Sequence, residues 1–335
     1  MKSQLRSLRV RNAVAIPLAL GIALVATGCS SAGTGSGGQS STVLRGVVAN
    51  TSDPFWNTMA CGATAAAKKR GVDLKWYGSK STDPTELNTN FNAALLDQPQ
   101  GVILDSPTVD QFSAQVAGQQ AKGVPFTMAV PMNPPSYNTV IGNQDAPPEM
   151  IAMGADVLKG GGSVFTVGGS AAVPLVADRY RLLLQELGKG SGVTILPVQF
   201  TDFDPTKTQV AVNSAILAHP DLKLLVASTG PETSGVLAAL QQAGRTDIKV
   251  ISFDAVPAAV EALRAGKILA IGSLPAAEVG EIQVNALADY VDQHKGSVQS
   301  ITEAKQSHIK TGLLTRQNID DPASARLIYK ATCDE

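Results

Sequence analysis

Several residue types are scarce in this chain, and each shortage excludes a class of protein. Only three of the 335 residues are cysteine, too few for a disulfide-dense secreted scaffold or for most zinc folds. The 27 lysine and arginine residues nearly balance the 28 aspartate and glutamate residues, so the basic excess typical of nucleic-acid-binding proteins is missing. Aromatic residues make up only 4% of the chain, which makes each one outside a hydrophobic core informative.

Motifs of catalysis are also missing. The sequence contains no Gly-x-Ser-x-Gly elbow, no Gly-x-x-x-x-Gly-Lys-Ser/Thr phosphate loop and no His-Glu-x-x-His pair. The three histidines, His219, His294 and His308, lie at predicted helix ends or near the C-terminus, as surface side chains do. We therefore expect no enzyme, no cofactor and no metal site. Acidic pairs leave no motif, so a secreted sugar-processing enzyme remains the least favoured alternative.

The N-terminal region differs in composition from the rest of the chain. Four basic residues and no acidic residue precede an apolar stretch from 13 to 26, which is short for a membrane span. A basic start followed by such a stretch predicts a secretory signal peptide over residues 1–28. Serine, glycine and threonine dominate residues 29–42, which predicts a flexible tether because these side chains cannot build a core.

A cysteine follows the predicted signal peptide directly. The small residues Ala26, Thr27 and Gly28 before Cys29 resemble a bacterial lipobox, with Ala26 standing where leucine is usual. This resemblance implies that Cys29 becomes the lipidated N-terminus and anchors the chain to the extracytoplasmic side of the cell membrane. An ordinary signal peptide with an incidental cysteine is the alternative.

Strands and helices alternate regularly from Val43 onward. Apolar, β-branched runs are separated by longer segments with helical spacing, which predicts parallel sheets covered by helices on both faces. Each half holds roughly four or five such strands, so we expect an α/β protein with two doubly wound lobes. Among these elements, helices are predicted over Pro54–Arg70, Pro84–Leu96, Asp110–Lys122 and Pro174–Leu187. A strand is predicted over Val193–Val198.

The scarce aromatic residues gather after predicted strands. Phe55 and Trp56 follow the first strand, Phe203 follows the strand at 193–198, and Phe253 follows the strand at 248–252. Ligands of open parallel sheets bind beyond the carboxyl ends of the strands. These loops are therefore the predicted ligand site.

The loop sequences resemble a known family. Residues 47–56, Val-Val-Ala-Asn-Thr-Ser-Asp-Pro-Phe-Trp, are similar to the first strand and loop of ribose-type (type I) periplasmic sugar-binding proteins, the sugar-capturing subunits of bacterial ABC importers. Three further segments, 201–204, 251–254 and 273–275, match later signatures of that family in the same order. The related repressors carry an N-terminal helix-turn-helix, which this sequence lacks.

The resemblance, which spans about residues 43–315, implies a division into two lobes joined by three crossovers near Gly142, Leu274 and Glu303. The ranges it implies are 43–141 plus 274–303 for the N-terminal lobe, 142–273 plus 304–318 for the C-terminal lobe, and 319–335 for a tail beyond the family's usual end. A ligand that touches both lobes would close this hinge.

The resemblance also implies roles for loop residues. Asp53 and Asp254 would accept hydrogen bonds from ligand hydroxyls, although a helix cap and a turn residue are their alternative roles. Phe55 or Trp56 from one lobe and Phe203 from the other would stack on the C–H faces of a sugar, with core packing as the alternative.

The chain departs from the family at several pocket positions. Thr229 replaces an asparagine, Ser273 replaces a glutamine, and Val130-Pro131 replaces an Asp-Arg pair. The arginine usual near the start of the helix at 174–187 is missing, and Arg179 is the candidate substitute. Ser106 and Asn133 are the last two candidate ligand residues. Fewer long polar groups predict a polyol, a deoxy or furanose sugar, or a furanone rather than a plain pentose.

The resulting prediction is a monomeric solute-binding lipoprotein that delivers a small carbohydrate-like ligand to an ABC permease and binds no nucleic acid. A ligand-binding subunit of a sensory or chemotaxis system is the alternative. The two remaining cysteines, Cys61 and Cys333, would lie in an exported compartment that permits a disulfide. We expect them to pair, with two unpaired thiols as the alternative; the sequence itself does not provide the Cα distance that a disulfide requires.

Overall fold

The computed structural model describes residues 41–80, 83–106, 109–129, 138–143, 145–171, 173–294 and 305–334. The predicted signal peptide, Cys29, most of the tether, the Val130-Pro131 departure and Asn133 lie outside these ranges. Within the described ranges, none of the helices is long and apolar enough to pass through a lipid bilayer.

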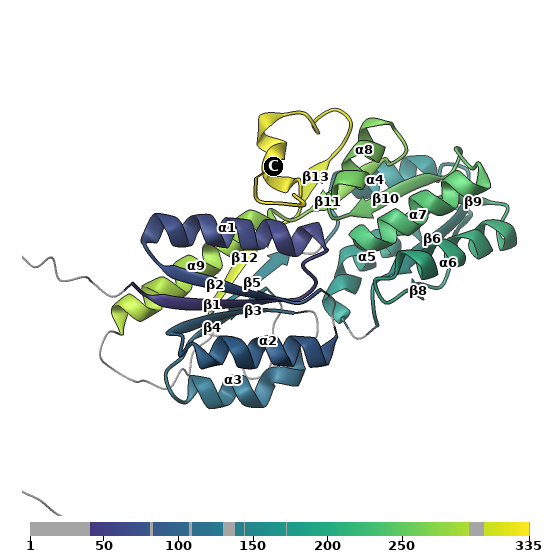
Figure 1. The fold of residues 1–335 in the computed structure, drawn as a ribbon. Coiled ribbons are helices and arrows are strands. Elements are labelled where there is room, and N and C mark those ends of the chain that lie inside the picture. Colours follow the sequence, from purple (N-terminus) through teal and green to yellow (C-terminus); the bar gives the residue numbers. More distant parts are fainter. Residues whose placement is uncertain are drawn as a thin grey trace, which may run out of the picture. The chain divides into compact units, whose positions relative to one another are not determined.

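The first sheet has six strands in the order β12-β5-β4-β3-β1-β2, and all of its strand pairs are parallel. Its strands are β1 (Val43–Val48), β2 (Asp73–Gly78), β3 (Gly101–Asp105), β4 (Phe126–Met128), β5 (Asn138–Asn143) and β12 (Lys305–Lys310). Helices cover both faces: α1 (Pro54–Arg70) and α9 (Ala276–Gln293) lie on one side, α2 (Pro84–Leu96) and α3 (Ser113–Gln120) on the other (Figure 1).

Local sequence explains where the helices of this lobe begin. Asp53 and Asp83 precede prolines at the first helical positions, and their carboxylates accept hydrogen bonds from the backbone N–H groups of the first turns. α1 ends at Gly71, whose φ of 66° is the left-handed conformation that glycine adopts without strain. The predicted bounds of α1 and α2 are therefore confirmed.

The second sheet has the strand order β13-β11-β10-β9-β6-β7, and β8 pairs with β6 beside β7. Only the β11–β13 pair among its described strands is antiparallel. The strands are β6 (Gly162–Gly168), β7 (Val193–Ile195), β8 (Gln199–Phe200), β9 (Leu222–Ala227), β10 (Lys249–Phe253), β11 (Ala270–Ser273) and β13 (Gly312–Leu314).

Two separate apolar clusters hold helices on the two faces of this sheet. One joins α4 (Pro148–Val157) and α5 (Pro174–Leu187) to the strands through side chains such as Met150 and Leu183. The other joins α6 (Pro205–Ala218), α7 (Gly230–Ala243) and α8 (Pro257–Arg264) through side chains such as Val212 and Val236. Both lobes are thus mainly parallel sheets covered by helices on both faces, which confirms the predicted fold class.

The structure differs from the predicted elements in the connecting regions. The helix predicted over Asp110–Lys122 is a 3₁₀ turn, η1 (Val109–Phe112), followed by the shorter α3. The strand predicted over Val193–Val198 ends at Ile195, two residues before Pro197, whose nitrogen cannot donate to a ladder. β5 and β12 were not predicted. The β12 sequence, Lys-Gln-Ser-His-Ile-Lys, is mostly exposed at the sheet edge and lacks an apolar pattern.

β12 also corrects the third predicted crossover. Residues 305–310 pair with β5 in parallel, from Lys305 opposite Asn138 to Lys310 opposite Asn143. The prediction that placed the boundary near Glu303, with 304–318 in the C-terminal lobe, is therefore wrong for these six strand residues. β12 forms the edge of the first sheet next to β5. The chain then leaves this sheet at Thr311 and enters the second sheet with β13.

Candidate functional site

Loops after the strands carry unusual backbone conformations. Asn50 follows β1, Asp202 and Phe203 follow β8, and Asp254 follows β10, with φ of 47°, 54°, 60° and 68° respectively. Non-glycine residues in this left-handed region cost about 1 kcal/mol or more, and such strain concentrates at ligand and catalytic loops. Only one other non-glycine residue of the described ranges, Gln98, has a positive φ, and it lies in the α2–β3 loop at the other ends of the strands.

The structure brings Asp254 and Arg179 together. Arg179, from α5, donates its Nη1 hydrogen to Oδ2 of Asp254 at 2.9 Å and also to the backbone carbonyl of Ser228 at 2.9 Å. Asp254 is only 6% exposed and Arg179 only 9%. A buried charge is tolerated when it is paired and hydrogen-bonded, so each of the two residues holds the other in place.

A third side chain completes this group, and sequence reasoning missed it. The phenol of Tyr329 donates to Oδ1 of Asp254 at 3.2 Å. Tyr329 is 1% exposed, and burial together with the charge of Asp254 raises its pKa well above the usual range, so the phenol remains a donor. It belongs to the tail, whose return to this site has no signal in the local sequence.

Asp53 lies near the same charges. Its half-buried carboxylate accepts a hydrogen bond from the Phe55 backbone N–H at 3.0 Å, so the predicted alternative role as a helix cap is present. Burial, assisted by the negative charge of Asp254, raises the pKa of Asp53 to about 6. Arg179 acts in the opposite direction on that pKa. One guanidinium therefore stands among several carboxyl groups.

Glu232, in the first turn of α7, is a further buried carboxyl group that sequence reasoning missed. It accepts hydrogen bonds from Oγ1 of Thr201 at 3.1 Å and from Oγ1 of Thr229. Burial raises the pKa of Glu232, and the charge of Asp254 adds to that rise. The Thr-x-x-Glu spacing of Thr229 and Glu232 is a capping-box signal, which could have drawn attention to the pair. Here the two side chains bond to each other instead of capping the helix backbone.

The predicted aromatic residues differ in exposure. Trp56 is 9% exposed and packs in the apolar core, as its alternative role requires. Phe55 is half-buried and lies edge-on to Trp56 and Tyr329, with ring centroids 4.9 and 5.5 Å away. Phe203 is also half-buried, and its ring lies so close to Gly169 that a Cβ there would overlap it.

The two predicted serines occupy buried positions. Ser106 directly follows β3 and is fully buried. Ser273, the last residue of β11, is 1% exposed and donates its hydroxyl to the Leu327 carbonyl at 2.7 Å. The structure thus gives Ser273 a bond to the tail. Among the residues that the structure describes, no group of three or more His, Cys, Asp or Glu side chains could hold a metal ion.

The chain is similar in sequence to two known binding proteins. The chain is 26% identical over 234 residues to the ribose import binding protein of Salmonella typhimurium, covering 68% of this chain and 78% of that protein. It is 23% identical over 272 residues to a xylitol-binding protein of Mycolicibacterium smegmatis, covering 76% and 73%.

Solved structures share the fold. A solute-binding protein of an ABC transporter from Agrobacterium vitis, bound with α-D-tagatopyranose, superimposes with a TM-score of 0.76 at 23% identity, covering 86% of this chain and 99% of that one. One from Mycobacterium smegmatis with bound glycerol superimposes with a TM-score of 0.72 at 22% identity, covering 87% and 99%. The periplasmic binding protein domain matches residues 46–295, and the chain therefore belongs to the periplasmic binding protein family.

Proposed function

We propose that this protein captures a small sugar or polyol between its two lobes and delivers it to the permease of an ABC transporter. The observation that carries the proposal is the buried Asp254–Arg179 pair directly after β10, which is the edge where parallel sheets bind ligands. Relatives named for ribose import and xylitol binding support the same ligand class.

The chemistry of the group suits a polyhydroxylated ligand. A carboxylate oxygen has two lone pairs, so Asp254 keeps acceptor capacity after binding Arg179 and Tyr329. Ligand hydroxyls would donate to Asp254 and Asp53, while the rings of Phe55 and Phe203 would cover the apolar C–H faces. Arg179 keeps the local charge from becoming wholly negative. Thr229 binds Glu232, so its hydroxyl contributes less to a ligand than an asparagine amide would.

Binding would act through hinge closure. The first lobe supplies Asp53 and Phe55, and the second supplies Phe203, Arg179 and Asp254. A ligand that bonds to both sets stabilises the closed arrangement by its differential contacts, and the permease would recognise that arrangement. We assign residues 43–143 and 276–310 to one moving lobe and 145–273 with 312–314 to the other, as the pairing of their strands suggests.

We further propose that the mature chain begins at a lipidated Cys29 and works as a monomer on the outer side of the cell membrane. The lipobox-like residues before Cys29 and the Ser/Gly-rich tether after it support this location. Such a tether lets a soluble domain reach the permease while its lipid stays in the membrane.

A thermal-shift panel tests the ligand class. The panel contains D-ribose, xylitol, D-tagatose, D-arabinose, D-fucose, myo-inositol and glycerol, and we expect at least one of them to raise Tm because a ligand of the folded state stabilises it. If none of these compounds changes Tm, the carbohydrate proposal fails.

Calorimetry of Asp254→Asn then tests the site with the strongest binder from the panel. Asparagine keeps the shape and tolerates the positive φ of 68°, whereas alanine would leave Arg179 buried without its partner. We expect affinity to fall at least about ten-fold, because hydrogen bonds to a charged acceptor are the strong ones. Asp247→Asn, an exposed carboxyl just before β10, is the matched control and should leave affinity unchanged. Equal affinity in both variants would remove Asp254 from the site.

A further inference from the structure

The tail docks first on the loop after β10. Ile328 forms a parallel bridge with Ala255, and the Tyr329 backbone N–H donates to the Ala255 carbonyl at 2.9 Å. One residue earlier, the Leu327 carbonyl accepts the Ser273 hydroxyl at 2.7 Å. These bonds hold Tyr329 beside Asp254, which immediately precedes Ala255.

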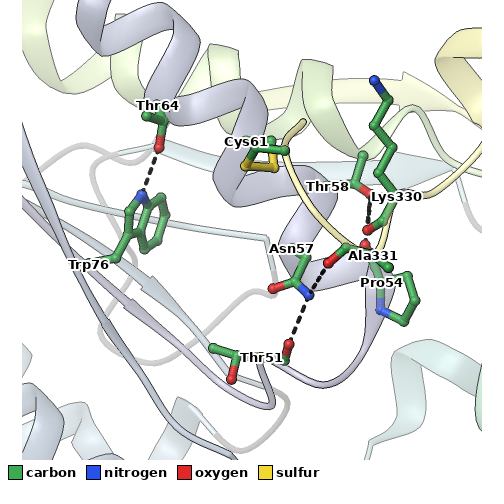
Figure 2. The surroundings of a disulfide bond; sticks show 10 residues. Thr51, Pro54, Asn57, Thr58, Cys61, Thr64, Trp76, Lys330 and Ala331 are labelled. Atoms are coloured by element: carbon green, nitrogen blue, oxygen red, sulfur yellow. Dashed lines mark hydrogen bonds between the residues drawn. A yellow bond between two sulfur atoms is a disulfide. The ribbon is translucent and has the colours of Figure 1, made fainter. Parts of the chain in front are cut away.

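The same tail then binds α1 of the first lobe. The Lys330 backbone N–H donates to Oγ1 of Thr58 at 2.7 Å, and Nδ2 of Asn57 donates to the Ala331 carbonyl at 3.1 Å. Cys333 forms a disulfide with Cys61, their Cα atoms 5.3 Å apart, so the structure contains the expected bond (Figure 2). Figure 2 shows these attachments along one side of the first turns of α1.

The attachments to the two lobes are close together along the chain. Only three residues lie between Tyr329 and Cys333, and four extended residue steps span at most about 14 Å. The covalent bond on α1 therefore limits how far the segment around Tyr329 can move from Asp53 and Phe55, which stand at the start of the same helix.

Tyr329 has the geometry to fix the orientation of Asp254. Its phenol holds Oδ1 while Arg179 holds Oδ2, so the carboxylate cannot rotate without breaking one of these bonds. The centroid of its ring also lies 5.5 Å from that of Phe55, which belongs to the first lobe. A carboxylate held at both oxygens presents its remaining lone pairs in fixed directions, which improves binding because less freedom is lost on association.

We propose that the segment Leu327–Cys333 is part of the ligand site, a disulfide-tied strap in which Tyr329 is the positioning residue for Asp254. The proposal rests on the function proposed above, with Asp254 as a ligand-binding residue. The tail then contributes to the affinity for a polyhydroxylated ligand as well as to the stability of the fold.

Tyr329→Phe in the full chain tests the positioning role, with D-ribose, xylitol and the strongest binder from the panel as probes. We expect a loss of affinity of about ten-fold, since one hydrogen bond to a charged group is removed. Because Tyr329 acts through Asp254, adding Tyr329→Phe to Asp254→Asn should lower affinity by less than Tyr329→Phe alone does. A merely structural tyrosine would lower affinity by the same factor in both backgrounds.

Tyr77→Phe is the matched control, because the Tyr77 phenol donates to Oδ2 of Asp97 at 2.6 Å, within the first lobe. It should leave the affinity unchanged. If Tyr329→Phe binds the probes with wild-type affinity, or weakens binding by the same factor with and without Asp254→Asn, while Asp254→Asn itself has lost affinity, the strap proposal is overturned and the proposed function stands. If the wild-type protein binds none of the probes, the proposed function itself fails.

The double variant Cys61→Ser/Cys333→Ser tests the covalent tie. It keeps Tyr329 but unties the strap, so we expect the strongest probe to dissociate at least about five-fold faster, with circular dichroism showing a folded protein. A dissociation rate equal to that of the wild-type protein would overturn the role of the disulfide in the site.

Discussion

Asp105, the last residue of β3, is a carboxyl group buried with neutral partners. It is 1% exposed and accepts hydrogen bonds from the Ala129 backbone N–H at 2.8 Å and from Nε2 of Gln283 at 2.9 and 3.0 Å. Burial raises its pKa to about 7, although these hydrogen bonds favour the charged form. The folded protein therefore binds a proton at Asp105 that the unfolded chain releases near pH 4.

This raised pKa makes stability depend on pH with a definite sign. The stability contributed by protonated Asp105 is fully present below about pH 4 and is lost as pH rises through about 7, which amounts to a few kcal/mol. We expect the free energy of unfolding of Asp105→Asn, measured in urea between pH 4 and 8, to lack the part of the decline that Asp105 causes. Asp247→Asn should keep the wild-type decline, because that exposed carboxyl has its pKa lowered to about 2 by Arg245. Parallel curves for wild type and Asp105→Asn would contradict the expectation.

At the residue scale, local signals predict where a side chain lies but not what it contacts. Asp254 follows the strand predicted at 248–252, Arg179 lies in the helix predicted at 174–187, and the structure brings the two together. Glu232 and Tyr329 were missed because their importance lies in partners from distant parts of the chain, Thr201 and Asp254.

At the scale of elements, the contact between α1 and α9 depends on two glycines. A Cβ on Gly62 would overlap the carbonyl oxygen of Ala277, and one on Gly280 would overlap that of Met59. The two backbones therefore touch without intervening side chains. This packing holds the first turn of α1, with Asp53 and Phe55, against the rest of its lobe.

Gly280→Ala should force the two helices apart. We expect a loss of about 1–3 kcal/mol in the free energy of unfolding, typical of overpacking, together with weaker ligand binding. Gly118→Ala on α3 is the control. A Cβ added at Gly118 would have no other atom within 4 Å, so this substitution should stabilise the protein by about 0.5–1 kcal/mol through helix propensity. Calorimetric unfolding of both variants measures the contrast, and equal effects would refute the close-contact argument.

Element prediction succeeded where caps mark the ends. Aspartates before prolines set the starts of α1 and α2, and these signals act within one turn. The edge strand β12 was missed because most of its side chains are exposed, so its sequence shows no apolar alternation. Among the described strands it pairs only with β5.

At the scale of the whole molecule, the proposed signal peptide and lipid anchor would determine where the protein works. All four charges of residues 1–28 are basic and would leave with the signal peptide, so the mature protein would be more acidic than the full chain. A lipid on Cys29 would then keep it at the membrane, because buried acyl chains contribute about 0.8 kcal/mol per methylene.

Cys29→Ser should release the protein from the membrane. In an expressing bacterium, we expect the wild-type protein in the membrane fraction and the variant in the soluble extracytoplasmic fraction or the medium. Cys333→Ser retains the predicted anchor and should remain with the membrane. The same distribution for Cys29→Ser and wild type, or a mature N-terminus without lipid by mass spectrometry, would refute the anchor.

The sequence by itself determined the parallel α/β architecture, the helix starts and the loops in which we propose the site. These features depend on periodicity, caps and short motifs, each read within a few residues. Only the tertiary structure decided that the tail returns to α1, that Tyr329 binds Asp254, and that Cys61 pairs with Cys333. The two cysteines are 272 residues apart in sequence, and a contact across that distance exists only because the packing of both lobes brings its partners together.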